Sequence, residues 1–338
     1  MININILTYL DYNLFDQQLD LNRFSKDFCF FENSNLDIEW DMVIVFETTK
    51  TTKTIKCKKG GLVFIAAEPP MSSVYSNLFL KQFDILFTAH PNIKNFKNII
   101  RKQYFNDWHF GFDTSTKKHR YSFEEIKYLK IPEKIKNISV ITSSLAVLPI
   151  HLKRLDFISK LKQIFGNEID FFGRGFNFVD DKADAILPYR FHICVENTNN
   201  NDLWTEKFAD PLIGYSVPIY IGCTNMDEYF PKDSFYSLNI NDPNGAINIL
   251  NEILADPIKC YNEKLDKLLQ ARNLLINDYN IYPTLVNLHL SKKINLGNVI
   301  TINIKPNNFS LEFVIKNYKL RLERFIFKKF YNLKKILK

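Results

Sequence analysis

Cysteine is scarce in this 338-residue sequence, and its five copies are scattered: Cys29, Cys57, Cys194, Cys223 and Cys260. No two of them form a Cys-x-x-Cys pair, and their number is odd. The sequence therefore predicts neither a disulfide framework nor a zinc site, and it favours a reducing compartment. An Asp-x-Asp motif, which commonly holds a divalent cation through its carboxylates, is also missing from the chain.

Long apolar runs are missing as well. No stretch of about 18 apolar residues occurs, so no membrane-spanning helix is predicted. The first residues, MININILTYLDYN, contain no basic segment, and we expect a strand there rather than a signal peptide. Acidic residues are nearly absent from residues 316–338, which hold nine Lys or Arg and one Glu within a chain whose net charge is +7. The basicity therefore belongs to a C-terminal tail and not to the main body.

The first part of the chain alternates short apolar segments with polar, helix-like spacers. The strand candidates are Ile2–Tyr9, Met42–Phe46, Leu62–Ala66 and Phe83–Thr88. They are apolar at nearly every position, as strands buried on both faces of a parallel sheet are. This alternation predicts an α/β fold.

A second alternation follows the polar segment 111–137, which we interpret as a linker with a domain boundary near residue 135. It comprises predicted strands at 138–142, 169–172, 191–195 and 217–221 and predicted helices at 152–165, 244–255 and 261–278. Residues 296–308 are ambiguous. We expect two Rossmann-like domains, 1–135 and 136–300, that face a cleft and are followed by a basic amphipathic tail at 301–338.

Residues 196–207, ENTNNNDLWTEK, follow the predicted strand 191–195 and so lie at the carboxyl end of its sheet, where such sheets bind ligands. We predict that a helix begins near Asp202–Leu203, with free amide groups that suit a phosphate. Glu206 could accept hydrogen bonds from a sugar diol, and Lys207 could offset phosphate charge. The alternative is structural: Glu206 only stabilises the helix dipole, and Lys207 is solvated.

Five ordered pieces lie within residues 172–235. They are Tyr189-Arg190-Phe191, Val195-Glu196-Asn197, Trp204-Thr205-Glu206-Lys207, Pro218-Ile219-Tyr220-Ile221-Gly222 and Tyr229-Phe230-Pro231-Lys232-Asp233-Ser234-Phe235. In this order they resemble the C-terminal domain of the α-1,3-fucosyltransferase family, glycosyltransferase family 10. The N-terminal half resembles the family only loosely.

The resemblance implies a GT-B fold and a metal-independent, inverting transfer of L-fucose from GDP-fucose, without a cofactor. Carried over by matched position, Glu206 would hold hydroxyls of the donor, and Lys207 and Arg154 would face its diphosphate. Glu196 and Asn197 would bind the donor beside them. Without a metal, the charge of the leaving diphosphate is stabilised by Arg, Lys and helix amides.

An inverting transfer needs a base that accepts the proton of the acceptor hydroxyl. The family takes a Glu from its N-terminal domain, within an E-x-P-like stretch that follows a buried strand. Glu68, followed by two prolines after the predicted strand Leu62–Ala66, matches this stretch and is the predicted base. Glu47 is the alternative, because it also lies at the carboxyl end of a strand.

Two features depart from the family pattern. Leu203 and Trp204 stand near the position where family members carry a Tyr, so an aromatic contact with the donor base is in doubt. Pro211 should kink or shorten the helix after Lys207. Another nucleotide sugar is therefore the alternative donor, and a non-catalytic protein that binds a nucleotide sugar or a glycan is the alternative function.

No metal site is expected. We interpret Asp180, Asp181 and Asp184 as solvated acids in a turn, and His192 as a packed histidine rather than a ligand.

The tail, residues 311–338, interleaves apolar and basic residues, and one helix face can hold Leu322, Phe325, Phe330, Leu333 and Leu337. Basic amphipathic helices of this kind lie on anionic membrane surfaces. We therefore expect a cytoplasmic, peripheral membrane protein that acts on a lipid-linked, cell-surface glycan of the lipopolysaccharide or O-antigen type. A helix packed on the protein body and a nucleic-acid arm are the alternatives, and nucleic acid is not an expected partner.

Overall fold

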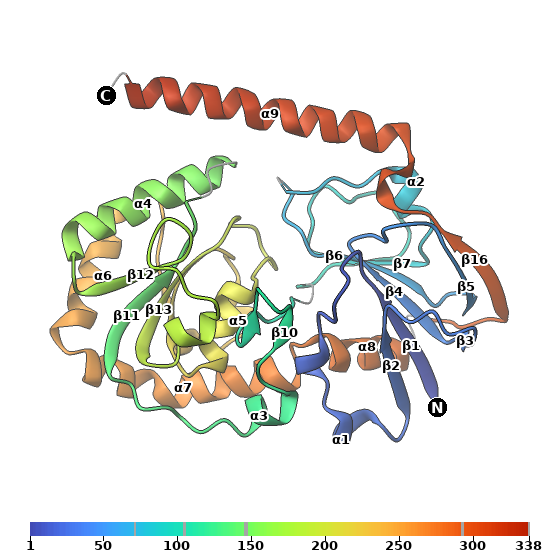
Figure 1. Ribbon diagram of the computed structural model, residues 1–338, viewed down its shortest axis with the longest axis horizontal. Coiled ribbons are helices and arrows are strands. Elements are labelled where there is room, and N and C mark those ends of the chain that lie inside the picture. Colours follow the sequence, from blue (N-terminus) through green and yellow to red (C-terminus); the bar gives the residue numbers. More distant parts are fainter. Residues whose placement is uncertain (71, 104–105, 145–147, 292–293, 337–338) are drawn as a thin grey trace. The chain divides into compact units, whose positions relative to one another are not determined.

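The structure is a computed structural model, and it describes residues 1–70, 72–103, 106–144, 148–291 and 294–336. The chain forms two compact units: unit 1 comprises Met1–Phe105 and Ile281–Lys338, and unit 2 comprises Asn106–Asn280. Each unit contains its own parallel sheet and its own hydrophobic core (Figure 1). The predicted α/β class, with two successive Rossmann-like sheets, is confirmed.

Unit 1 is built on a six-stranded sheet with the strand order β2-β1-β4-β6-β7-β8, in which all neighbours pair in parallel. The strands are β1 (Ile2–Leu7), β2 (Phe28–Glu32), β4 (Met42–Phe46), β6 (Leu62–Ala66), β7 (Ile85–Thr88) and β8 (Ile99–Ile100). Every residue of β4, β6 and β7 is buried. This burial explains why these segments are unbroken apolar runs in the sequence.

A second sheet in unit 1 joins segments that are distant in the sequence. Its strands are β3 (Glu39–Trp40), β5 (Lys53–Lys58) and β16 (Val299–Ile304), and β16 pairs antiparallel with β5. The helices of this unit are α1 (Leu21–Phe24), α2 (Asn77–Leu80), α8 (Ile281–Leu290) and α9 (Leu311–Ile336). The ambiguous segment 296–308 thus contains a strand that returns to the N-terminal part of the chain.

Unit 2 is built on a five-stranded parallel sheet with the order β12-β11-β13-β14-β15. The strands are β11 (Lys136–Ile141), β12 (Ile169–Phe172), β13 (Tyr189–Val195), β14 (Val217–Ile221) and β15 (Tyr236–Ser237). The helices are α3 (Phe123–Lys127), α4 (Pro149–Phe165), α5 (Glu206–Ile213), α6 (Pro243–Ala255) and α7 (Pro257–Asn277). A short hairpin consists of β9 (Phe112–Asp113) and β10 (Lys118–His119).

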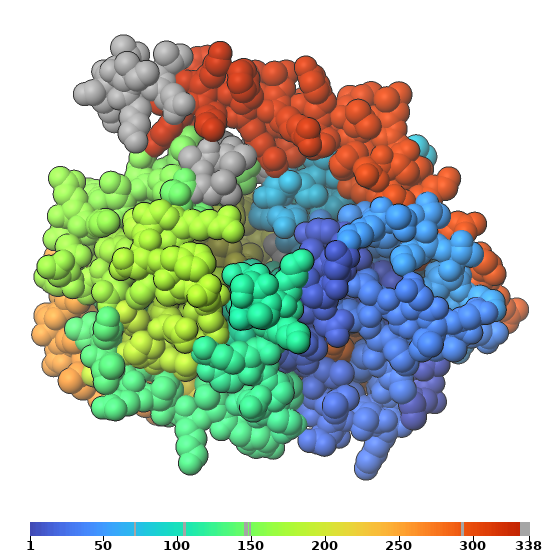
Figure 2. Space-filling view, viewed as in Figure 1, coloured from blue at the N-terminus to red at the C-terminus, as the bar shows by residue number. Residues whose placement is uncertain are grey.

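The division between the units differs from the predicted boundaries at residues 135 and 300. Residues 106–135 belong to unit 2, because this segment buries Trp108, Phe110, Phe123 and Ile126 in the core of that unit. In Figure 2 the segment (teal and green) lies directly against yellow-green residues of the same unit. Residues 281–304 belong to unit 1, where β16 extends a sheet. Both shifts reflect tertiary contacts that a polar or ambiguous sequence does not reveal.

The predicted tail at 301–338 is also not a separate part, because its first residues pack on unit 1. Glu312 accepts a hydrogen bond from Asn77 N at 2.9 Å, at the start of α2. The Lys316 ammonium donates to the carbonyl oxygen of Tyr75 at 3.0 Å, and Leu320 is buried. These residues are spaced by four and so share one face of α9.

The predicted apolar face of the tail lies only partly within the residues that the structure describes. The described part of α9 ends at Ile336, so Leu337 and the side chain of Leu333 lie outside the described residues. Among the helices that are described, none combines the length and apolar character needed to cross a membrane.

Asn307 holds the chain segment before α9 to two other loops of unit 1. Its side-chain Nδ2 donates to the carbonyl oxygen of Val74 at 2.7 Å, and its Oδ1 accepts from Ser76 N at 3.1 Å. Its own amide donates to Thr48 Oγ1 at 2.9 Å. Asn307 is buried, whereas the adjacent Asn308 is exposed.

We expect Asn307→Ala to lower the free energy of unfolding by about 2 kcal/mol, because it leaves the half-buried carbonyl group of Val74 and the buried amide of Ser76 without the side chain that now bonds them. Thermal unfolding should show a decrease in Tm of roughly 2–4 °C. The matched control is Asn308→Ala, which should stay within about 0.5 kcal/mol of the wild type. Equal effects of the two substitutions would contradict the role given to Asn307.

Candidate functional site

Helix α5, whose N-terminus lies at the carboxyl end of the unit 2 sheet, begins at Glu206 and not near Asp202–Leu203 as predicted. Thr205 is the N-cap, and its Oγ1 accepts a hydrogen bond from Lys207 N at 3.3 Å. Asp202 has a φ of 61°, outside the helical region, and its carboxylate accepts from Asn225 Nδ2 and Tyr229 OH. These contacts keep Asp202 in the preceding loop.

Glu196 connects the end of β13 to the start of α5. Its side chain is almost fully buried, at 1% exposure. Oε1 of Glu196 accepts from both the amide and the hydroxyl of Thr205, each at 2.8 Å. The Lys207 ammonium lies 3.6 Å from Oε2. Burial raises the pKa of Glu196, and the positive charge of Lys207 opposes this rise.

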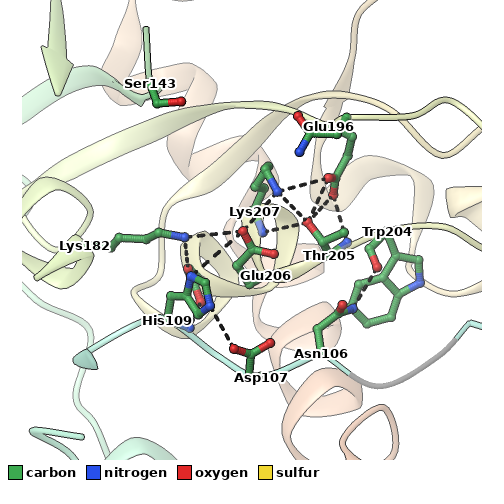
Figure 3. Close-up of polar contacts among 12 residues, drawn as sticks. Asn106, Asp107, His109, Ser143, Lys182, Glu196, Trp204, Thr205, Glu206 and Lys207 are labelled. Atoms are coloured by element: carbon green, nitrogen blue, oxygen red, sulfur yellow. Dashed lines mark hydrogen bonds and ion pairs between the residues drawn. The ribbon is translucent and has the colours of Figure 1, made fainter. Parts of the chain in front are cut away.

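Glu206 lies between two lysines, as Figure 3 shows. Its Oε1 is 3.0 Å from the ammonium of Lys207 and 3.5 Å from that of Lys182. His109 Nδ1 lies 4.0 Å from the same oxygen. Burial alone would raise the pKa of Glu206, but Lys207, Lys182 and His109 lower it well below its ordinary value. Glu206 is therefore a carboxylate at neutral pH.

Lys207 carries a positive charge that the surrounding acids maintain. Burial by itself would lower its pKa, but the carboxylates of Glu206 and Glu196 raise it above the ordinary value. The interpretation of Lys207 as a solvated lysine is therefore wrong, because its ammonium contacts Glu196, Thr205 and Glu206.

Arg154 and Asn197, which were predicted to bind the donor, contact each other. Arg154 lies on α4, and its Nη1 donates to Asn197 Oδ1 at 2.9 Å. Its Nη2 donates to the carbonyl oxygen of Ser143 at 3.3 Å, just beyond β11. Arg154 is close enough to Lys207 for its charge to act on the pKa of that lysine. The structure thus brings the five predicted donor-binding residues of unit 2 together at one sheet edge.

The site also contains residues that the sequence analysis missed, chiefly Lys182 and Asp210. Asp210 is 1% exposed and accepts hydrogen bonds from the amides of His109 and Phe110 at 2.9 and 3.1 Å. Its other oxygen lies 3.2 Å from the Lys182 ammonium. A signal existed in the sequence, because Asp210 follows Glu206 by four residues and so shares its helix face.

In the segment that contains Lys182, the prediction of a turn with solvated acids is wrong for Asp181, whereas Asp180 and Asp184 are exposed as expected. Asp181 is buried, accepts from the amides of Gly111 and Ala183, and pairs with Arg120 at 3.1 Å. Asp184 pairs with Arg120 as well, at 3.0 Å. These contacts fix the segment against residues 109–120 and so position Lys182 beside α5.

His109 adds a titratable group to the site. Its Nε2 lies 2.9 Å from a carboxylate oxygen of Asp107. Burial and Lys182 lower the pKa of His109, but Asp107 and Glu206 outweigh them and raise it overall. Of the residues that the structure describes, no three His, Cys, Asp or Glu are grouped so that they could hold a metal ion.

Three predicted features of this region can be compared with the structure. His192 is packed, as expected: its Nδ1 lies 2.7 Å from Ser139 Oγ, and burial lowers its pKa to about 3. The ring of Trp204 is buried and packs edge-on against Phe230, with ring centroids 5.1 Å apart. It therefore lies in the core and is not presented to a ligand. Pro211 lies inside α5, which ends two residues later.

The predicted base Glu68 belongs to unit 1, in the segment that follows β6. Its backbone amide donates to Glu47 Oε1 at 2.8 Å. Glu47, the alternative base, is 7% exposed. Both residues lie at the carboxyl ends of parallel strands, as the sequence suggests.

The unit 2 site gathers three cations, Arg154, Lys182 and Lys207, around carboxylates at the edge of a parallel sheet. Buried or half-buried cations in fixed positions bind phosphate oxygens well, because little reorganisation is needed. The carboxylate of Glu206 can accept hydrogen bonds from hydroxyl groups. The arrangement is therefore suited to a ligand that carries both phosphates and hydroxyls.

Residues 131–261 match the family model described as Glycosyltransferase family 10 (fucosyltransferase) C-term. The resemblance that the ordered sequence pieces indicate is thereby confirmed. This match contains the whole cluster from Arg154 to Asp210.

Individual relatives match a smaller share of the chain. The Drosophila melanogaster protein named Alpha-(1,3)-fucosyltransferase B is 35% identical over 94 residues, 27% of this chain and 21% of the relative. The Helicobacter pylori protein named Alpha-(1,3)-fucosyltransferase FucT is 34% identical over 68 residues, 20% of this chain and 14% of the relative. The matches therefore span only about a fifth of these relatives or less.

One solved structure that resembles the chain is titled Crystal Structure of alpha1,3-Fucosyltransferase. It has a TM-score of 0.48 and 18% sequence identity, and the match covers 83% of this chain and 91% of that one.

We expect Thr205→Ala to reduce the free energy of unfolding by about 1–2 kcal/mol, because it removes the N-cap of α5 and a hydroxyl that bonds the buried Glu196. Thr205→Ser is the matched control, since it keeps the hydroxyl and should retain most of the wild-type stability. Urea titrations of the two variants measure the difference. Similar losses in both variants would show that the methyl group matters and the hydroxyl does not.

Proposed function

We propose that the protein is a glycosyltransferase that transfers L-fucose from GDP-fucose to a hydroxyl group of a glycan. The observation that carries this proposal is the cluster of Arg154, Lys182 and Lys207 with Glu206, within residues that match family 10. Three cations suit the two phosphates of a nucleoside diphosphate, and the carboxylate suits the hydroxyls of its ribose or sugar.

In the proposed reaction the acceptor oxygen attacks the anomeric carbon of fucose in a single displacement, and the configuration at that carbon is inverted. The bond from this carbon to the diphosphate breaks, and GDP leaves with the electron pair. Arg154, Lys182 and Lys207 stabilise the negative charge that develops on the leaving phosphate, so the reaction needs no metal ion. Glu68 takes the proton of the acceptor hydroxyl.

The existing ion pairs favour this role because they hold the cations before any ligand arrives. Lys207 is fixed by Glu196 and Glu206, and Lys182 is fixed by Glu206 and Asp210. A lysine held in this way loses less side-chain entropy when it binds a phosphate than a mobile surface lysine does. The same feature also supports the second candidate, a protein that binds a nucleotide sugar without turnover.

We expect Lys207→Ala to reduce transfer from GDP-fucose at least about 100-fold, because it removes a cation that stabilises the leaving diphosphate. Glu206→Ala should weaken donor binding as well. Release of GDP and thermal stabilisation by GDP-fucose, GDP-mannose, UDP-sugars and dTDP-sugars are the measurements.

The matched control is Lys259→Ala, which removes an exposed lysine from α7 of the same unit and should leave transfer unchanged. Full activity of both site variants would contradict the proposal. Stabilisation of the wild type by a nucleotide sugar, without any released nucleoside diphosphate, would favour the binding protein. Stabilisation by a different sugar nucleotide would change the donor and keep the reaction class.

We further propose that α9 holds the protein on an anionic membrane surface, where the acceptor is a lipid-linked glycan of the lipopolysaccharide or O-antigen type. The face of α9 opposite to Glu312, Lys316 and Leu320 carries a stripe of exposed apolar side chains. These residues are spaced by three or four positions, and they are Leu311, Ile315, Tyr318, Leu322 and Phe325. Figure 2 shows this helix (red) at the surface of its unit. Lysines and arginines flank the stripe, as in helices that lie in a membrane interface.

We place the protein on the inner face of the cytoplasmic membrane in this proposal. The five cysteines are free, which agrees with a reducing compartment. A cytoplasmic leaflet also carries the anionic lipids that attract a basic helix.

We expect the double substitution Lys328→Glu/Lys329→Glu to reduce binding to vesicles that contain phosphatidylserine by at least about tenfold, because each lysine near such a surface contributes about 1 kcal/mol. Both lysines are exposed and lie beyond the packed turns of α9. The matched control, Lys259→Glu/Lys267→Glu on α7, changes the net charge equally and should bind as the wild type does. Sedimentation with vesicles measures binding, and equal binding by all three proteins would contradict the membrane role.

A further inference from the structure

Glu47 in unit 1 is a buried acid with an unusual backbone. It directly follows β4 and has a φ of 65°, in the left-handed region that non-glycine residues rarely adopt. Strands β4, β6 and β7 are neighbours in the sheet (Figure 1), so their carboxyl ends lie side by side. A strained backbone that carries a buried charge is retained only where the surrounding structure enforces it, and such positions cluster at functional sites.

The carboxylate of Glu47 holds the segment that carries Glu68. Its Oε1 accepts hydrogen bonds from the backbone amides of both Ala67 and Glu68, the latter at 2.8 Å. The hydroxyl of Tyr75 lies 2.8 Å from Oε1 and 2.7 Å from Oε2. Because both oxygens are engaged inside the unit and the residue is 7% exposed, Glu47 is poorly placed to take a proton from an acceptor.

Titratable groups from three other segments of unit 1 lie near Glu47 and Tyr75. The Glu68 carboxylate acts on Glu47 from the segment after β6. His90, after β7, packs edge-on against the Tyr75 ring with centroids 5.6 Å apart. Two residues come from α9. Lys316 donates a hydrogen bond to the carbonyl oxygen of Tyr75, and Arg324 is close enough to Glu68 for the carboxylate charge to act on the pKa of the arginine.

We propose that Glu47 is a positioning residue for the transfer reaction, one that fixes the backbone of the segment that carries Glu68. The inference rests on the proposed function, in which Glu68 is the base. Two amides bound to one carboxylate oxygen fix the backbone on either side of the Cα atom of Ala67, and the two prolines that follow Glu68 restrict it further.

Burial of the Glu47 carboxyl group makes the stability of the folded protein depend on pH. Burial and the charge of Glu68 raise the pKa of Glu47 to about 7. The folded protein therefore binds a proton more tightly at this site than the unfolded chain does. Stability contributed by this group is present at low pH and is lost as the pH rises through about 7.

The test is Glu47→Gln, which keeps an oxygen that can accept the two amides but removes the charge. We expect this variant to keep most of the wild-type kcat, whereas Glu47→Ala, which removes the acceptor of both amides, should lower kcat about 10- to 100-fold, because a small misplacement of a catalytic group has effects of this size. KM for GDP-fucose should not change.

Two further measurements separate positioning from a structural role. The Tm of Glu47→Gln above pH 7 should equal or exceed that of the wild type, whereas a purely structural residue would give a lower Tm at every pH. Hydrogen exchange of the Ala67 and Glu68 amides should become faster in Glu47→Ala, which removes the acceptor. The matched control is Asp84→Asn, whose carboxylate accepts the amide of Leu62 at 3.0 Å, at the opposite end of β6; its kcat and pH profile should match the wild type.

Wild-type kcat in Glu47→Ala, or equal losses of kcat in Glu47→Gln and Glu47→Ala, would overturn the inference. So would a reduced Tm with unchanged turnover per folded molecule. Failure of the proposed function is a different result, since the wild type itself would then neither be stabilised by GDP-fucose nor release GDP. In that case unchanged exchange of the two amides in Glu47→Ala would still overturn the inference.

Discussion

The buried carboxylate of Glu196 is the constraint on which the site in unit 2 depends. A charge in this position is tolerated only when hydrogen bonds and an opposite charge surround it, and Thr205 and Lys207 provide both. Thr205 donates its amide and its hydroxyl to Glu196 from the N-cap position, directly before the first helical residue, and α5 accordingly begins at Glu206. The start of α5 then determines which side chains face the sheet edge. Glu206 and Asp210, one helical turn apart, both meet Lys182.

Unit 1 contains a similar arrangement, in which a buried acid at the end of a strand accepts backbone amides of a later segment. Glu47 follows β4 as Glu196 follows β13, and each carboxylate accepts backbone amides from the next functional segment. In both units an acid at the carboxyl end of a parallel strand converts a flexible connection into a fixed one. This arrangement explains how loops at such an edge can hold reactive groups in place without regular secondary structure.

Much of the fold follows from the sequence, because strands buried on both faces have a distinctive composition. β4, β6, β12 and β14 have the bounds that their apolar runs predict. The ordered set of motifs also predicted the donor-side residues, which the structure brings together: Arg154, Glu196, Asn197, Glu206 and Lys207. Lys182, His109 and Asp210 were missed, since their roles arise from contacts between segments up to 101 residues apart.

The sequence by itself determined the class of the fold, the position of the sheet edges and the residues that carry the family resemblance. Local composition and order are sufficient for these features. The tertiary structure alone decided that residues 106–135 belong to unit 2 and that residues 281–304 return to unit 1. It also decided that Glu47 holds the Glu68 segment and that α9 packs on unit 1 through one face only. These features depend on which groups meet across the chain, and burial and pairing of charge act on contacts that no local pattern contains.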